Sequence, residues 1–230
     1  MVAMNLAALA EQNLAEHGEY ERLVFEGRSY TNKELHDRSA RLARALHRLG
    51  LAPGDKVVVM MTNCPEVFVS YAGIWRAGLV TIPVLFLLES NEVRYILKNS
   101  EAKAVLTSPE THAKVAAAVE GLPVRVVVTG GPEELPAGAL SFDELIATDA
   151  ALERPVPRKD HDIATILYTS GTTGRPKGVV QTHKNLYANA MNGWNSAKTR
   201  RIGETSLLVL PLAHTFGLSA LLNGYLFASR

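Results

Sequence analysis

The chain has 230 residues, 47% of them hydrophobic and 20% charged, which is ordinary for a globular protein and excludes intrinsic disorder, collagen-like structure and a coiled coil. Its 24 basic and 23 acidic residues leave a net charge of +1. This balance argues against nucleic acid or an anionic membrane surface as the main partner, because both need clustered basic charge.

The number of cysteines and the length of the apolar runs exclude further classes of protein. Cys64 is the single cysteine, so an intrachain disulfide and a cysteine zinc site are excluded, and we expect a reducing compartment, the cytoplasm. We find no signal peptide. No stretch reaches the roughly 18 apolar residues of a membrane span.

The first predicted elements are two short strands over residues 22–30, around a turn at Glu26 and Gly27. A hydroxyl at Thr31 and a carboxylate at Glu34 form a capping box, which predicts a helix that ends at Gly50. We interpret the arginines of this helix as a solvated face rather than an anion site. They are Arg38, Arg41, Arg44 and Arg48.

Short apolar runs bounded by turn residues predict buried strands. These runs cover residues 56–61, 79–84, 103–107, 124–129 and 163–169, with a further strand over 179–181. Helices are predicted from Pro65 to Gly78, over 90–98 and 109–119, and from a capping box at 141–144. The polar segment 149–160 is interpreted as a linker. Strands that alternate with helices at this spacing predict an α/β fold, a doubly wound parallel sheet with helices on both faces.

The segment that carries chemistry follows the predicted strand 163–169. Residues 170–178 (SGTTGRPKG) contain three glycines, three hydroxyl side chains, one arginine and one lysine. A tight turn needs only about two to five residues and no such set of donors. Backbone N–H groups freed by glycine, hydroxyl groups and a lysine are the groups that hold phosphate oxygens. The composition therefore predicts an oxyanion site.

Three familiar motifs do not describe this segment. The Walker pattern requires a Gly-Lys pair before Ser or Thr, whereas Lys177 is followed by Gly178. The dinucleotide pattern G-x-G-x-x-G lacks its second glycine at Thr173. The nucleophile elbow G-x-S-x-G has Tyr168 where its first glycine would stand. The phosphate loop is therefore of another kind.

The stretch 168–179 (YTSGTTGRPKGV) resembles the signature loop of the adenylate-forming superfamily. Its members include acyl-CoA synthetases, firefly luciferase and the adenylation domains of peptide synthetases. The stretch 210–217 (LPLAHTFG) resembles a later motif of the same family. Further matches lie at 29–35, 50–59, 63–66 and 77–78, so the resemblance covers essentially the whole chain. It is strongest to fatty-acid or aromatic-acid CoA ligases.

The resemblance implies ATP-dependent activation of a carboxylic acid. The acid attacks the α-phosphate of ATP in the presence of Mg²⁺, which gives acyl-AMP and pyrophosphate, and coenzyme A then takes the acyl group. Such transfers depend on positioning and charge stabilisation, for which a donor-rich loop is suited. The resemblance assigns catalytic roles to Lys177, Thr173 and His214, with Thr173 near the Mg²⁺. It assigns the β- and γ-phosphates to Ser170, Gly171, Thr172, Thr173, Gly174 and Lys177.

The same resemblance places His214 on the carboxylate pocket, close to the entry for the thiol. Relatives that activate amino acids carry an aspartate at the start of the next helix, whereas residues 214–219 (HTFGLS) hold no acidic side chain. Burying an unpaired ammonium group is costly, so a fatty or aromatic acid without an amino group is favoured. We place Phe216, Gly217 and Leu218 of the predicted helix 216–228 on the acyl pocket.

The domain prediction also follows from the resemblance. Residues 55–200 would form one contiguous parallel subdomain, and 1–54 and 201–230 would be parts of a second sheet. The family's adenine-binding segment, ribose-binding aspartate, hinge and C-terminal lysine have no counterpart, so we expect an N-terminal portion that is inactive alone.

Two other functions stay open, a stand-alone phosphate- or nucleotide-binding module and a non-catalytic interaction protein derived from a truncated synthetase. The expected partners are the acid, ATP and coenzyme A. A homodimer is left open, and no nucleic acid is expected.

Overall fold

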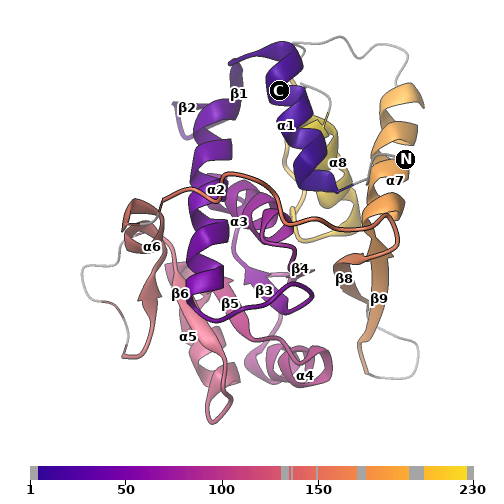
Figure 1. Cartoon of the computed structure of the whole chain (residues 1–230). Helices are drawn as coiled ribbons and strands as arrows, with labels where there is room; N and C mark the ends of the chain where they lie inside the picture. Colours follow the sequence, from indigo (N-terminus) through magenta and orange to yellow (C-terminus); the bar gives the residue numbers. More distant parts are fainter. Residues whose placement is uncertain are drawn as a thin grey trace.

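A computed structural model describes residues 5–130, 135, 137–148, 150–169, 175–196 and 205–226. Its centre is a sheet of seven strands (Figure 1). They are β3 (Lys56–Met60), β4 (Val80–Pro83), β5 (Ala104–Thr107), β6 (Arg125–Val128), β7 (Leu140–Ser141), β8 (Ile163–Thr169) and β9 (Lys177–Thr182). The spatial order is β7-β6-β5-β3-β4-β8-β9, with β9 antiparallel to β8 and every other pair parallel. The predicted doubly wound parallel sheet is confirmed, with an antiparallel strand at one edge.

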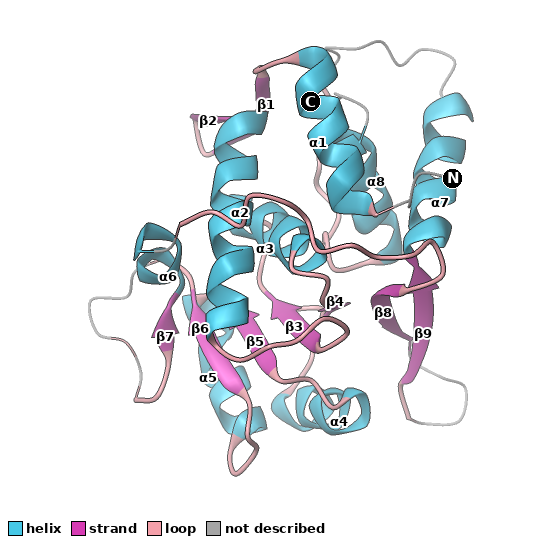
Figure 2. Ribbon diagram, viewed as in Figure 1, coloured by secondary structure: helices cyan, strands magenta, loops and turns pink. Residues whose placement is uncertain are grey.

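Helices cover both faces of this sheet (Figure 2). They are α1 (Leu6–His17), α2 (Asn32–Arg48), α3 (Pro65–Arg76), α4 (Ser90–Ser100), α5 (Pro109–Val119), α6 (Phe142–Thr148), α7 (His183–Ser196) and α8 (Thr215–Leu226). The side chains of β3 alternate between two cores, because successive residues of a strand point to opposite faces. Val57 and Val59 pack with α2 and α3, whereas Val58 and Met60 pack with α4 and α5.

The N-terminal hairpin is separate from the main sheet. Strands β1 (Glu21–Phe25) and β2 (Arg28–Thr31) pair only with each other in the described part of the chain. The backbone N–H of Glu34 donates to the Thr31 hydroxyl at 3.0 Å, which confirms the predicted cap of α2. Arg41, Arg44 and Arg48 are exposed, as a solvated face requires, whereas Arg38 is partly buried and pairs with Glu66 at 2.8 Å.

Most predicted elements are confirmed to within about two residues, and three elements were not predicted. The missed elements are α1, β7 and α7. None of the helices in the described ranges is long and apolar enough to cross a membrane.

A group of buried hydroxyls fills the space between the carboxyl ends of β3 and β5. The Thr111 hydroxyl donates to the carbonyl oxygen of Met60 at 2.8 Å and lies 2.8 Å from the Thr107 hydroxyl. Ser108 is also buried here. The residues that follow β3 and β5 lead to α3 and α5, which pack on opposite faces of the sheet. These hydrogen bonds therefore lie where the chain leaves β3 toward one face of the sheet and leaves β5 toward the other.

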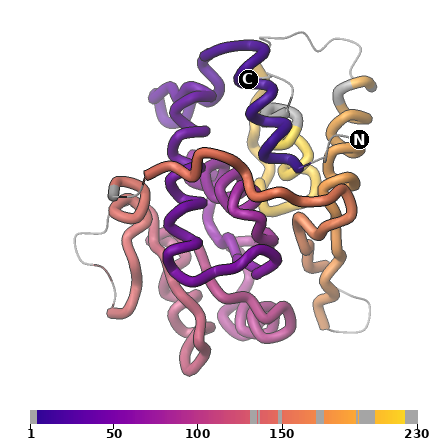
Figure 3. The backbone as a smooth tube through the Cα atoms, viewed as in Figure 1, coloured from indigo at the N-terminus to yellow at the C-terminus, as the bar shows by residue number. Residues whose placement is uncertain are grey.

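A segment without helix or strand, residues 150–162, crosses the molecule from α6 to β8 (Figure 3). Arg76, at the end of α3, holds it. Its Nε donates to the Leu152 carbonyl and its Nη2 to the Glu153 carbonyl, both at 2.7 Å. Its Nη1 lies 2.7 Å from a carboxylate oxygen of Glu11 in α1. The predicted linker is therefore a bound strap, which we call the crossing strap.

The crossing strap also contacts the end of α3, the residue before α1 and the start of α7. The Val156 N–H donates to the Arg76 carbonyl, and the Asn5 side chain donates to the Val156 carbonyl, each at 2.8 Å. The backbone N–H of His183 donates to the Asp162 carbonyl at 3.2 Å. The His183 ring is fully buried, and its Nδ1 accepts from the Leu6 N–H at 3.4 Å. The start of α7 and the start of α1 are thereby joined.

Replacing Arg76 by Lys tests the dependence of the fold on its guanidinium. The planar guanidinium donates to two strap carbonyls and to Glu11 at once. A lysine ammonium group cannot reach all three, so some buried acceptors would lose their donor. We expect the free energy of unfolding in urea to fall by about 2–3 kcal/mol. Arg44→Lys, on the exposed face of α2, is the matched control and should change it by less than about 0.5 kcal/mol. Equal effects of the two substitutions would contradict the assigned role.

Replacing His183 by Asn tests its buried, neutral state. Burial lowers the pKa of His183 from 6.5 to about 4. Between these values the unfolded chain binds the proton more readily, so the stability that His183 contributes is full above pH 6.5 and is lost as the pH falls to 4. Asparagine keeps an acceptor for Leu6 but does not titrate. The pH dependence of the urea midpoint should therefore flatten in this range, and the exposed His161→Asn control should keep the slope of the unaltered protein.

Candidate functional site

The candidate phosphate loop connects β8 to β9. In the ladder between these strands Thr169 is paired with Lys177 and Tyr168 with Gly178, so the described residues form the stem of the loop. Ser170, Gly171, Thr172, Thr173 and Gly174, which the sequence assigns to ATP, lie outside the described residues. Lys177 is placed as the first residue of β9, and it is exposed.

The β8–β9 pair stands out from the sheet as a two-stranded ribbon. The ladder between β8 and β4 has a single pair of partners, Thr81 and Thr165. Beyond Thr165, the ladder of β8 continues only with β9, among the residues that the structure describes. Val179 and Val180 on β9 are 47% and 51% exposed. We call residues 166–169 and 177–180 the ribbon end.

Gly178 has a packing role in the ribbon end. A Cβ atom at this position would lie 2.9 Å from Cγ2 of Ile166 and 3.2 Å from the ring of Tyr168. The Tyr168 ring therefore lies against the partner strand where only glycine leaves room. Gly178 is thus a glycine for a packing reason as well as for its place in the predicted phosphate loop.

His214 lies in the turn before α8, and its ring is at an exposed position. Its backbone N–H donates to the Pro211 carbonyl, and its own carbonyl accepts from the Leu218 N–H, each at 2.9 Å. Asn63 holds the segment before this turn. Its Nδ2 donates to the Leu210 carbonyl, and its Oδ1 accepts from the Leu212 N–H, each at 2.9 Å. No role is predicted for Asn63 from the sequence, although it lies in the stretch 63–66 that resembles the family.

The three residues predicted for the acyl pocket point in different directions. Phe216 is 65% exposed, whereas Leu218 is buried with Leu221 in the larger core. A Cβ atom on Gly217 would overlap the carbonyl oxygen of Pro211, so glycine lets α8 approach that turn closely. No hydrogen bond or ion pair joins His214 to Lys177 in the described part of the chain. Their shared role in one site stays a prediction.

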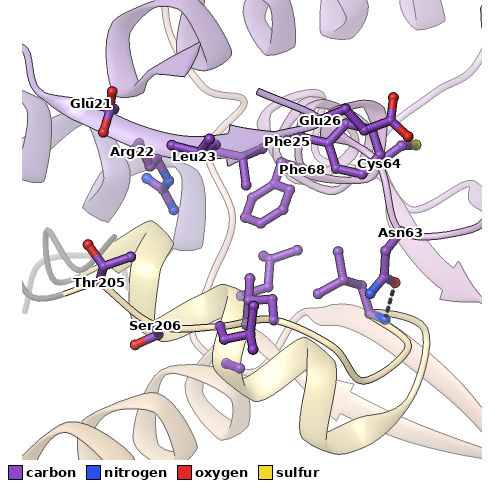
Figure 4. A pocket seen from close by; sticks show the side chains of 16 residues that line it. Glu21, Arg22, Leu23, Phe25, Glu26, Asn63, Cys64, Phe68, Thr205 and Ser206 are labelled. Carbon is purple, nitrogen blue, oxygen red and sulfur yellow. Dashed lines mark hydrogen bonds between the residues drawn. The ribbon is translucent and has the colours of Figure 1, made fainter. Parts of the chain in front are cut away.

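A cavity of about 590 Å³ lies elsewhere, between β1, the start of α3, residues 205–212 and α8 (Figure 4). Its wall is largely apolar, with Phe25, Phe68 and Leu212 among the lining side chains. Of the residues predicted for the phosphate or acyl site, none of those that the structure describes lines it. Cys64 does, and burial raises the pKa of its thiol to about 12. A thiol with a raised pKa carries little of the reactive thiolate at neutral pH.

No group of three or more His, Cys, Asp or Glu residues that could hold a metal ion occurs among the described residues.

Comparison with known proteins identifies the family. The family described as AMP-binding enzyme matches residues 10–229. The chain belongs to this family. One similar relative is a 4-coumarate–CoA ligase 2 of Oryza sativa subsp. japonica, which is 34% identical; the match covers 85% of this chain and 37% of the relative. Another is a long-chain-fatty-acid–CoA ligase of Bacillus subtilis, which is 27% identical; the match covers 87% of this chain and 40% of the relative. The chain thus spans well under half the length of these curated relatives.

Solved structures support the same fold for this AMP-binding chain. An anthranilate CoA ligase in complex with anthranoyl-AMP matches with a TM-score of 0.93 at 24% identity, over 100% of this chain and 45% of its own. A benzoate CoA ligase from Burkholderia xenovorans LB400 matches with a TM-score of 0.88 at 26% identity, over 98% and 44%. The predicted adenylate-forming fold and family are confirmed.

Replacing Gly217 by Ala tests the close approach of α8 to the turn before it. Alanine favours helix over glycine by about 1 kcal/mol, but its Cβ would overlap the Pro211 carbonyl. Because a backbone group cannot rotate away as a side chain can, we expect a net loss of about 2 kcal/mol in the free energy of unfolding. The neighbouring Phe216→Ala, at an exposed side chain, should cost much less. A stabilised Gly217→Ala variant would contradict the observed packing.

Proposed function

We propose that the protein takes part in ATP-dependent activation of a carboxylic acid, forming acyl-AMP and then an acyl-CoA. The observation that carries this proposal is the donor-rich loop 170–178 at the ribbon end of a chain whose fold matches CoA ligases. Because the chain spans only part of those relatives, the complete reaction, its substrates and its partners are proposals for the whole protein.

The proposed chemistry begins with a carboxylate oxygen that bonds to the α-phosphorus of ATP while the bond to the bridging oxygen breaks and pyrophosphate leaves. The thiol of coenzyme A then attacks the acyl carbonyl, and AMP leaves. Charge gathers on the departing phosphates, so Lys177 and the N–H and hydroxyl donors of 170–174 would stabilise it. Mg²⁺ accepts hard oxygen ligands and binds largely through substrate phosphates, so the Thr173 hydroxyl is a chemically suitable partner for it.

The proposed substrate is a fatty or aromatic acid that carries no ammonium group beside the carboxylate. The relatives named above act on 4-coumarate and on long-chain fatty acids according to their names. Residues 214–219 contain no carboxylate that could pair with an ammonium group. We propose that His214 meets the carboxylate and that Phe216, Gly217 and Leu218 contribute to the wall around the acyl chain.

We further propose that residues 55–200 act as one subdomain that presents the phosphate loop. All seven strands of the main sheet fall within this range, which supports the proposal. Residues 1–54 and 201–230 would belong to a second sheet in the complete enzyme. The separate β1–β2 hairpin is consistent with this division.

The test is titration of Mg-ATP into the protein by calorimetry. A lysine that donates to a phosphate oxygen contributes a charge-assisted hydrogen bond, so Lys177→Ala should weaken binding about tenfold or more. Lys184→Ala, at an exposed position on α7, is the matched control and should bind as the unaltered protein does. Identical affinities for Lys177→Ala and the unaltered protein would refute the assignment. Release of pyrophosphate that depends on added acid, in the full-length protein, would distinguish a ligase from a phosphate-binding module.

A further inference from the structure

The ribbon end is joined to helix α4 by a hydrogen bond between side chains. The phenol of Tyr168 donates to Oδ1 of Asn99 at 2.7 Å, across 69 positions of the sequence. Tyr168 lies two residues before the candidate phosphate loop. Asn99 lies in the last turn of α4, and neither residue has a role in the function proposed above.

The ribbon end needs support from outside its own ladder. A two-stranded ribbon is marginally stable by itself in water. Here the ladder with the parallel sheet stops at Thr165, and residues 177–180 of β9 are exposed. Support must therefore come from the side chains of β8 that face the rest of the protein. Ile166 and Tyr168 pack on the core that β8 shares with α4, and Leu167 is buried in the core on the other face of the sheet.

The direction of the Tyr168 ring is fixed by its neighbours. Gly178, its partner in the ladder, leaves the room that the ring occupies, and a Cβ there would lie 3.2 Å from the ring. The phenol then reaches Asn99 with a short hydrogen bond. Three features, the ladder, the glycine and the asparagine, thus define where the strand before the loop ends.

Helix α4 is a firm support for this hydrogen bond. Ile96 and Leu97, in the turn before Asn99, are fully or almost fully buried. The Ser100 hydroxyl donates to the Ile96 carbonyl at 2.6 Å. An acceptor held on such a helix turn can fix the strand end, because the helix backbone does not move with the ribbon.

We propose that Tyr168 and Asn99 form a strut that sets the position of the phosphate loop relative to the sheet, and that both are positioning residues for the triphosphate. This proposal rests on the proposed function in that the loop is taken to bind ATP. The strut itself is defined by the geometry alone. Without it the ribbon end is held by its own ladder and by packing alone.

The first test removes each end of the strut separately. Tyr168→Phe loses only the hydroxyl, and Asn99→Leu loses the acceptor. Both should speed amide hydrogen exchange at residues 177–180 about fivefold and weaken Mg-ATP binding by a similar factor, with no further change in the double variant. Tyr20→Phe is the matched control, because it removes another Tyr–Asn hydrogen bond, from Tyr20 to Asn13 at 3.1 Å, elsewhere in the protein. It should change neither readout.

The second test separates positioning from general stability. Asn99→Asp retains an acceptor oxygen, so exchange at the ribbon end should return close to that of the unaltered protein. Urea unfolding should place Tyr168→Phe and Tyr20→Phe at similar midpoints, with only the former affecting the ribbon end. Exchange that is unchanged in both Tyr168→Phe and Asn99→Leu would overturn the strut. So would an increase that extends evenly over the whole sheet.

The two proposals fail in different ways. If the unaltered protein does not bind Mg-ATP, the proposed function fails, and the exchange rates at 177–180 without ligand still decide whether the strut exists. If the unaltered protein binds Mg-ATP and Tyr168→Phe binds it equally well despite faster exchange, the positioning role is refuted while the phosphate loop stands.

Discussion

The Arg76 guanidinium joins helices α1 and α3 to the crossing strap, which leads to the last two strands of the sheet, β8 and β9. It contacts α1 through Glu11 and the crossing strap through Leu152 and Glu153. The strap carries the chain from β7 at one edge to β8 beside β4, on the other side of the sheet. Trp75, next to Arg76, donates to the Ala164 carbonyl of β8 at 3.1 Å. The placement of β8, and with it the ribbon and the loop, thus depends on the end of α3.

The sequence predicted the central sheet because its strands are short runs of valine, isoleucine and leucine between turn residues, a pattern that burial on both faces requires. It could not predict what Arg76 and His183 do. Each looks like an ordinary polar residue of a helix, and the Leu6 N–H that His183 accepts from is 177 positions away. Helix α1 was missed because, of its buried residues Leu6, Ala7, Ala10 and Asn13, only Leu6 is large and apolar, which gives little hydrophobic contrast.

The candidate site also combines features that the sequence predicts with features that only the structure shows. The composition of 170–178 indicates phosphate chemistry, because donor-rich loops have few other uses. It does not show that Gly178 also makes room for Tyr168, since that depends on ladder register. Phe216 and Leu218 are two positions apart and point to solvent and to the core, because a helix turns about 100° per residue. These two residues therefore lie on different sides of α8, and the pocket wall proposed for them stays a prediction.

Doubly wound sheets usually receive ligands outside the carboxyl ends of the strands, where neighbouring connections leave in opposite directions. In this protein the hydroxyls of Thr107 and Thr111 and the carbonyl of Met60 satisfy one another there, and the threonines are fully or almost fully buried. The crevice that the fold class offers to a nucleotide is thus occupied by the protein's own polar groups. General likeness to dinucleotide-binding sheets would direct a search for the nucleotide to these strands, whereas the phosphate loop proposed above follows β8.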